Sequence, residues 1–137
     1  MSINVENKLA IHELLGRAAL GYDERDQTML AACFTEGAVF TMRIAGGDLV
    51  GPFEGQANIM ELMTSSMATQ TDVRRHVISN IVFTESNPHR VTSNLTLLAT
   101  ENDQTKLLSA GLYRDEVCES DGQWKISKRH LDLDKSY

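Results

Sequence analysis

Apolar residues between Val5 and Tyr22 recur every three or four positions along the chain. They fall at Ile11, Leu14, Leu15, Ala18 and Tyr22, and charged residues fill positions between them. Residues at this spacing share one face of a helix with 3.6 residues per turn. The pattern therefore predicts an amphipathic helix at the start of the chain.

The next segments predict two more helices and a strand between them. Asp26 can cap a short second helix, with an apolar side at Leu30, Cys33 and Phe34. The β-forming residues from Ala38 to Ile44 predict a strand. The segment 51–55 contains two glycines and a proline, which indicates a turn. A third helix is predicted from the spacing of Ile59, Leu62, Met63 and Met67.

From Asp72 onward the apolar period changes to two, which is typical of strands. Turn signals at Asn87-Pro88, Asn102-Asp103 and Asp121-Gly122 divide this half into strands near 72–85, 90–101, 105–118 and 123–132. Helices followed by an antiparallel meander predict an α+β fold, with the helices on one face of a curved sheet. The sheet is longer than the helices can fill, so we expect a pocket on its concave side.

Strand 105–118 carries apolar residues on both of its faces. Leu107 and Val117 belong to one parity, and Leu108, Ala110 and Leu112 to the other. Burial on both sides of a strand requires a second layer over the outer face of the sheet. The pattern therefore predicts a homo-oligomer, a dimer or a trimer.

Composition narrows the class of protein. The 137 residues fit one domain spanning 1–137. Lys and Arg number 13 against 19 Asp and Glu, and the net charge of −6 disfavours nucleic acid and anionic membranes as partners. Cys33 and Cys118 lie far apart in a chain with no signal-peptide pattern, which indicates reduced thiols and a cytoplasmic location.

The usual motifs for metal, nucleotide and serine chemistry are absent from the sequence. No histidine pair has the spacing of a zinc protease helix, and there is no C-x-x-C, G-x-S-x-G, P-loop or G-x-G-x-x-G. We therefore expect neither a metal nor a cofactor. Acid–base chemistry by side chains is the remaining enzymatic class.

Among the four histidines, His76 is the candidate for such chemistry. His12 and His89 are expected in solvent, whereas His76 lies inside a strand, on one face with Ile78, Asn80 and Val82. That position suits a base that points into a cavity. It equally suits a core histidine that is bonded to Asn80 or to the backbone. Asp23, just after the first helix, is in the same way either a functional carboxylate or an ordinary turn residue.

Six motifs in order resemble the SnoaL-like branch of the nuclear-transport-factor-2-like (NTF2-like) superfamily. They are G-Y-D-E-R-D at 21–26, F-T-E-G-A-V-F at 34–40, G-P-F-E-G at 51–55, R-H-V-I-S-N at 75–80, G-L-Y-R-D-E at 111–116 and D-G-Q-W-K-I-S-K-R at 121–129. The resemblance implies a conical α+β half-barrel with a deep apolar pocket. Members such as scytalone dehydratase, bile-acid 7α-dehydratase and hexachlorocyclohexane dehydrochlorinase use an Asp–His dyad in that pocket.

Carried over by this resemblance, the dyad falls on Asp23 and His76, with Tyr22 and Arg129 as further pocket residues. A carboxylate bonded to one ring nitrogen holds the imidazole in the tautomer whose other nitrogen can take a proton. Arg129 would stabilise developing negative charge, and Tyr22 would act as a neutral donor. Strand parity allows only one of Arg129 and His130 to face the pocket unless a bulge intervenes, and Arg129 is preferred.

The function expected from the sequence is that of a cofactor-free lyase of the dehydratase type, or an isomerase, acting on a small hydrophobic cyclic substrate. A polyketide-type cyclase shares the first proton abstraction and stays open as an alternative. A non-catalytic module for small-ligand binding or assembly is the alternative from another class.

Overall fold

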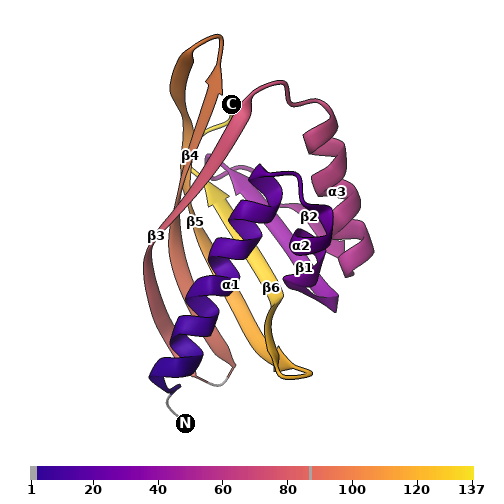
Figure 1. Ribbon diagram of the computed structural model, residues 1–137, viewed down its shortest axis with the longest axis vertical. Coiled ribbons are helices and arrows are strands. Elements are labelled where there is room, and N and C mark those ends of the chain that lie inside the picture. Colours follow the sequence, from indigo (N-terminus) through magenta and orange to yellow (C-terminus); the bar gives the residue numbers. More distant parts are fainter. Residues whose placement is uncertain (1–2, 87) are drawn as a thin grey trace.

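Helix α1 (Val5–Asp23) lies across the concave face of a curved six-stranded sheet, and α2 (Gln27–Ala32) and α3 (Gln56–Ala68) cover the rest of that face (Figure 1). The computed structural model describes residues 3–86 and 88–137. The strands are β1 (Phe34–Ile44), β2 (Val50–Glu54), β3 (Val73–Ser86), β4 (His89–Glu101), β5 (Gln104–Ser120) and β6 (Gln123–Leu133). The arrangement confirms the predicted α+β class with helices on one face of the sheet.

The strand order in the sheet is β2-β1-β6-β5-β4-β3. Neighbouring strands are antiparallel except for β1 and β6, which pair in parallel, with Phe40 beside Arg129. The first long strand therefore lies against the last one. This pairing brings Arg129 into the middle of the sheet.

The apolar side of α1 forms one wall of the hydrophobic core. Ile11 and Leu15 are completely buried, and Leu14 and Ala18 are nearly so, as their spacing predicts. Side chains from α3 and from the strands belong to the same core, including Phe34, Ile59, Leu95 and Ile126. Burial of such side chains stabilises the fold by roughly 1.5–3 kcal/mol each relative to exposure.

Two predicted boundaries near the start of the sheet are wrong. The second helix ends at Ala32, and Phe34, expected on that helix, begins β1 and pairs with Ile126 of β6. The segment 51–55, expected to be a turn, belongs largely to the edge strand β2, in which Phe53 pairs with Phe40. In both places, strand pairing overrides the local preference: Phe34 pairs with the distant strand β6, and 51–55 pairs with the preceding strand β1.

The prediction that Asn80 and Val82 share a face of the strand with His76 is also wrong, and it holds only as far as Ile78. The β3–β4 register shifts between Ser79 and Val82, and Asn80 adopts a left-handed backbone conformation with φ 54°. A bulge of this kind moves the side chains that follow it to the opposite face, here as far as the next register shift between Phe83 and Glu85. Asn80 and Val82 are therefore exposed, while Ile81 packs against the core.

A second bulge in β6 decides which side chain enters the concave face. Val117 pairs with Ile126, but Glu116 pairs with Lys128, so Ser127 is an extra residue in β6. Beyond it Arg129 points inward and is 6% exposed. His130 faces the opposite side, where its Nδ1 lies 2.7 Å from the Thr41 hydroxyl.

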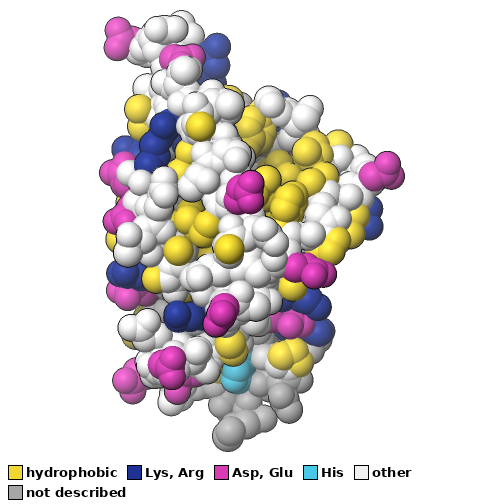
Figure 2. Space-filling view, turned by 90° about the vertical axis from the view of Figure 1, so that its right-hand side faces the viewer, with side chains coloured by type: hydrophobic (Ala, Val, Ile, Leu, Met, Phe, Trp, Pro, Cys, Tyr) yellow, Lys and Arg dark blue, Asp and Glu magenta, His cyan; other side chains and the backbone are white. Residues whose placement is uncertain are grey.

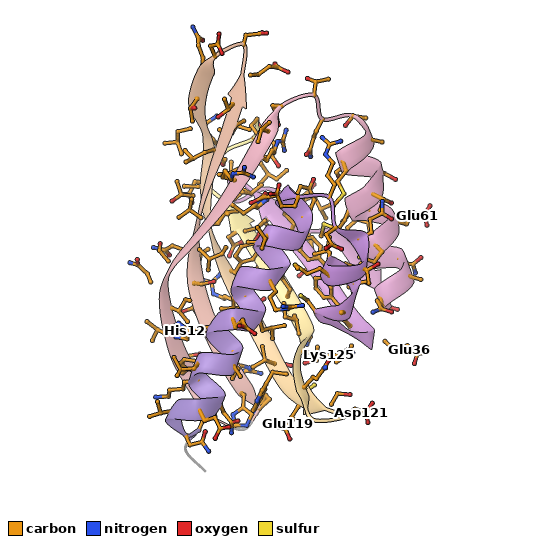
Figure 3. The ribbon with its side chains drawn as sticks, in the orientation of Figure 1. His12, Glu36, Glu61, Glu119, Asp121 and Lys125 are labelled. Atoms are coloured by element: carbon orange, nitrogen blue, oxygen red, sulfur yellow. The ribbon has the colours of Figure 1, made fainter. Side chains whose placement is uncertain are left out.

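The remaining histidines lie away from this face. His12 is exposed, as expected, and its ring stacks on Phe83 at 5.9 Å beside β3 (Figure 3). His89 is half-buried rather than solvated, because its ring packs edge-on against Trp124 at 5.3 Å. The turn predicted at Asn87-Pro88 falls partly on residue 87, which lies outside the described residues.

Within residues 3–86 and 88–137, no helix has the length and apolar character needed to cross a membrane.

Candidate active site

The helices and the concave face of the sheet form a partly open cavity of about 130 Å³. Most of its lining is apolar and comes from α1, α2, α3 and five of the strands. The polar side chains that line it are Tyr22, Ser66, His76, Tyr113, Arg129 and Tyr137. A dry cavity of about 150 Å³ in another protein binds benzene, so this volume suits a ligand built on one small ring. Hydrophobic side chains also reach the surface on the side of the molecule covered by α3 (Figure 2).

The carboxylate of Asp23 binds His76 at two points. Asp23 Oδ1 lies 2.5 Å from His76 Nδ1, and Asp23 Oδ2 accepts a hydrogen bond of 2.7 Å from the His76 backbone N–H. Because a carboxylate accepts, the ring bond places the imidazole proton on Nδ1. No described residue is bonded to Nε2, and His76 lines the cavity, so Nε2 is available to a ligand. Both side chains are largely buried, at 14% exposed for His76 and 5% for Asp23.

The end of α1 places Asp23 in this position. The helix stops there because Arg25 adopts a left-handed conformation with φ 56°, and the Asp26 N–H donates back to the Gly21 carbonyl at 2.8 Å. Gly21 lets α2 approach closely, since a Cβ at that residue would lie 2.9 Å from the Leu30 nitrogen. The close α1–α2 corner therefore fixes the direction of the Asp23 side chain.

Tyr22 lies beside His76, with its ring edge-on and the centroids 4.9 Å apart. Its hydroxyl accepts a hydrogen bond of 2.6 Å from the Gln70 side-chain amide. The backbone carbonyl of Gln70 in turn accepts a hydrogen bond of 2.7 Å from the Arg25 guanidinium. Burial raises the pKa of Tyr22, and the bond from Gln70 opposes that shift. The phenol thus keeps its proton and can donate it toward the cavity.

Arg129 is held by Asp115 through two parallel hydrogen bonds. Arg129 Nε and Nη2 donate to the two carboxylate oxygens at 2.8 and 3.0 Å, and the Asp115 side chain has no exposed surface. Burial acts to lower the pKa of Arg129, but the charge and hydrogen bonds of Asp115 outweigh it and raise that pKa overall. The guanidinium therefore stays charged, with much of its charge neutralised by its partner.

The guanidinium carbon of Arg129 lies over the ring of Tyr113, 3.9 Å from its centroid. Tyr113 is 7% exposed and lines the cavity, and burial raises its pKa from 10.0 to about 12. Such a phenol is neutral at every physiological pH. It is a hydrogen-bond donor next to the Arg129 guanidinium, which Asp115 holds in place.

Tyr22, His76 and Arg129 line one cavity, and Asp23 contacts it only through its bond to the His76 ring. The sequence-based reasoning missed Gln70, Tyr113 and Asp115. The alternation that places Tyr113, Asp115 and Val117 on one face of their strand was an available signal for Tyr113 and Asp115. Pairing Asp115 with Arg129 needed the β6 bulge, which has no clear sequence signature.

Metal-ligating side chains and reactive thiols are two other sources of chemistry. No group of three or more His, Cys, Asp or Glu side chains that could hold a metal occurs in the described part of the chain. Cys33 and Cys118 are free thiols, and burial raises the pKa of Cys33. A raised pKa makes a thiol a poor nucleophile at neutral pH.

Known structures share this fold at low sequence identity. An NTF2-like protein with a cystatin-like fold from Novosphingobium aromaticivorans is 17% identical, with a TM-score of 0.79 over 94% of this chain and 82% of that one. A Catenulispora acidiphila protein in complex with S-DNPA is 20% identical, with a TM-score of 0.82 over 96% of each chain. A protein proposed to be the beta subunit of an aromatic-ring-hydroxylating dioxygenase, from N. aromaticivorans, is 18% identical, with a TM-score of 0.79 over 93% of this chain and 89% of that one.

No curated protein matches the chain. The family model described as a SnoaL-like domain matches residues 4–130, which is nearly the whole sequence. Together with the cystatin-like architecture, that match shows that the chain belongs to the SnoaL-like domain family of the NTF2-like superfamily.

Proposed function

We propose that the protein is a cofactor-free lyase of the dehydratase type, or an isomerase, in which Asp23 and His76 act as an acid–base dyad. One observation carries the proposal. Asp23 bonds both the ring and the backbone of His76, which leaves Nε2 facing an apolar cavity. A neutral imidazole held in this way can remove a proton from a carbon atom, and the carboxylate stabilises the imidazolium that forms.

The reaction begins when His76 Nε2 takes a proton from a C–H bond of the substrate. In a dehydration, the electron pair left on carbon forms a double bond as the neighbouring C–O bond breaks. The leaving hydroxide takes the proton from His76 and departs as water. In an isomerisation, His76 returns the proton to a different carbon atom. Tyr22 and Arg129 are proposed as donors to the oxygen atoms that gain negative charge.

The size and lining of the cavity support a small hydrophobic cyclic substrate. A volume of about 130 Å³ with mostly apolar walls accommodates one ring and few substituents. Cyclisation of a polyketide begins with the same proton abstraction and would use the same residues.

A non-catalytic role is a second candidate. The proposed dioxygenase beta subunit from N. aromaticivorans shares this fold, which suggests that such a domain can serve within a larger assembly. In that role the Asp23–His76 contact would only stabilise the corner between α1 and β3.

The proposal extends to the setting of the protein. A cytoplasmic enzyme that meets a small molecule, and neither nucleic acid nor a membrane, agrees with the net charge of −6 and the two free thiols. Exposed apolar residues on the outer face of the sheet, such as Val77 and Leu107, support a homo-oligomer.

Replacing each member of the dyad tests the catalytic role. We expect His76→Ala to lower kcat about 10²-fold or more, since positioned base catalysis contributes roughly 10²–10⁴-fold. Asp23→Asn should also lower kcat. Its amide oxygen can keep the backbone bond, but its NH₂ group then faces Nδ1 and favours the tautomer with a protonated Nε2. Turnover of a panel of small cyclic hydroxy compounds is measured together with the melting temperature of each variant.

The matched control is His12→Ala, which removes an exposed histidine from the same helix that carries Asp23. It should leave turnover unchanged. Full turnover in His76→Ala contradicts the catalytic proposal. A large drop in melting temperature with unchanged turnover in both dyad variants supports the structural role.

A further inference from the structure

The floor of the cavity carries a phenol that the dyad chemistry does not use. Tyr113 lies on the inner side of β5, and its hydroxyl makes no hydrogen bond with any residue of the described chain. The hydroxyl is not one of the fully buried polar atoms that lack a partner, so it keeps accessible surface. Tyr113 lines the cavity, so a ligand in the cavity can supply the missing acceptor.

The ring of Tyr113 is held in one place. The Arg129 guanidinium covers one face at 3.9 Å, and Asp115 fixes that guanidinium by two hydrogen bonds. Asp115, on the same strand, and Arg129, on the adjacent strand β6, thus hold the ring that carries the Tyr113 hydroxyl. Preorganised donors of this kind stabilise charge that develops during a reaction, because they need no rearrangement.

The hydroxyl also lies within the electrostatic reach of the dyad. The carboxylate of Asp23 is among the charges that act on the ionisation of Tyr113, and both Tyr113 and His76 line the same small cavity. A ligand of one ring can therefore contact both residues. Arg129 is already neutralised by Asp115, which makes the neutral phenol the better candidate for a direct contact.

We propose that Tyr113 is a further catalytic residue, whose hydroxyl binds the carbonyl oxygen of the substrate while His76 removes a proton from an adjacent carbon. The substrate is then a small cyclic carbonyl compound, because only an oxygen conjugated with the reacting carbon gains negative charge in that step. Asp115 is a positioning residue that holds the Tyr113 ring through Arg129, and Arg129 keeps its proposed role as a second donor. This inference rests on the proposed function, and it specifies the substrate class.

Binding of an enolate analogue tests the inference without turnover. 4-Nitrophenolate carries one ring and one anionic oxygen, and nitrobenzene is the same ring without that oxygen. We expect the wild-type protein to bind nitrophenolate more tightly than nitrobenzene. Tyr113→Phe keeps the ring and its contact with Arg129 but removes the donor, so the Kd for nitrophenolate should rise roughly ten- to a hundredfold, as for a hydrogen bond to a charged group. The Kd for nitrobenzene should stay the same.

Ser93→Ala is the matched control. Ser93 pairs with Tyr113 across β4 and β5, and its buried hydroxyl likewise has no partner among the described residues, but it does not line the cavity. Its removal should change neither Kd. Because neither hydroxyl has a protein partner, neither variant should have a melting temperature below that of the wild-type protein.

Three results overturn the assignment of Tyr113. They are equal affinity of the wild-type protein for the two ligands, an unchanged nitrophenolate Kd in Tyr113→Phe, and an equal loss of nitrobenzene binding in that variant. The proposed function fails separately, through full turnover in His76→Ala. Loss of nitrophenolate binding in Tyr113→Phe would then still establish the oxygen-binding donor.

Discussion

Asp115 and Arg129 form an ion pair in which neither side chain is appreciably exposed, at 0% and 7%. Removing either partner from such a pair leaves an unpaired buried charge, which typically costs about 3–5 kcal/mol. The pair itself is close to neutral in its effect on stability, because both charges lose their hydration. In the proposed site, the pair holds the ring of Tyr113 beneath a fixed guanidinium.

Tyr113 should make the stability of the protein fall between pH 10 and pH 12. Burial raises its pKa from 10.0 to about 12, so in this range the unfolded chain has lost the phenolic proton and the folded chain keeps it. The free energy of unfolding then decreases by about 1.4 kcal/mol per pH unit from this group. Below pH 10 both states hold the proton, and the full contribution is present.

Urea unfolding of wild-type protein and Tyr113→Phe from pH 8 to pH 12 measures this effect. The difference in unfolding free energy between the two proteins should change by about 2 to 3 kcal/mol across the upper two pH units. Ser93→Ala, which removes a neighbouring hydroxyl that does not titrate, should follow the wild-type curve. Parallel curves for wild-type protein and Tyr113→Phe would show that the phenol is not buried as described.

At the scale of elements, two β-bulges determine which side chains reach the concave face of the sheet. Asn80 resets β3, so that Ile81 rather than Val82 packs inward, and Ser127 resets β6, so that Arg129 rather than His130 does. In each strand the residues before the bulge follow ordinary alternation. A single inserted residue therefore changes the chemistry of the concave face.

The left-handed conformation of Asn80 makes this bulge sensitive to substitution. Asn80→Val should lower the free energy of unfolding by about 1–2 kcal/mol, because a β-branched residue is strained at a φ of 54°. Asn80→Gly should preserve stability, since glycine adopts that conformation without strain. Urea unfolding at pH 7 checks both.

Asn94→Val provides the comparison. Asn94 is exposed on the neighbouring strand β4 and is not among the residues with positive φ, so the same substitution there should cost nothing. An equal loss of stability at both positions would mean that the loss comes from the asparagine side chain and not from the backbone of the bulge.

The sequence predicts the elements well wherever one local period persists. The apolar residues of α1 and the four strands after Asp72 have clear periods of 3.6 and 2, and their bounds agree with the structure to within one or two residues, apart from the register changes. The edge strand β2 was missed because its glycine and proline content favours a turn. Bulges are missed because the pairing partner, and not the bulged strand alone, decides the register.

At the scale of the whole molecule, the outer face of the sheet is the proposed oligomer interface. Val73, Val77, Val82 and Leu107 are 44–63% exposed on it. We expect Leu107→Glu to shift the protein toward monomer, because it places a charge within an apolar contact. Light scattering at micromolar concentration measures the mass of each protein.

Leu9→Glu controls for the added charge, since Leu9 is 65% exposed on α1, away from the sheet. It should keep the oligomeric mass of the wild-type protein. A wild-type protein that is monomeric throughout this concentration range would contradict the proposed interface.

The candidate site could be predicted only in part, because some of its residues follow from the family resemblance and others depend on tertiary packing. The resemblance supplied Asp23 and His76, and the structure places them in contact through the α1–α2 corner. The contacts of Gln70 with Tyr22 and of Asp115 with Arg129 could not be predicted, since these residues meet only through tertiary packing. The parallel pairing of β1 with β6 is non-local in the same way.

That β1–β6 pairing has a consequence for how the chain folds. Phe34 of β1 can pair with Ile126 of β6 only once both residues have been synthesised. The centre of the sheet therefore closes only after all of the intervening chain is present. Contacts of such long sequence separation slow folding, because the entropy of loop closure is lost before the contacts form. Until β6 docks, β1 and β5 each present an open edge, and a nascent chain of this family is most exposed to aggregation just before its last strand emerges.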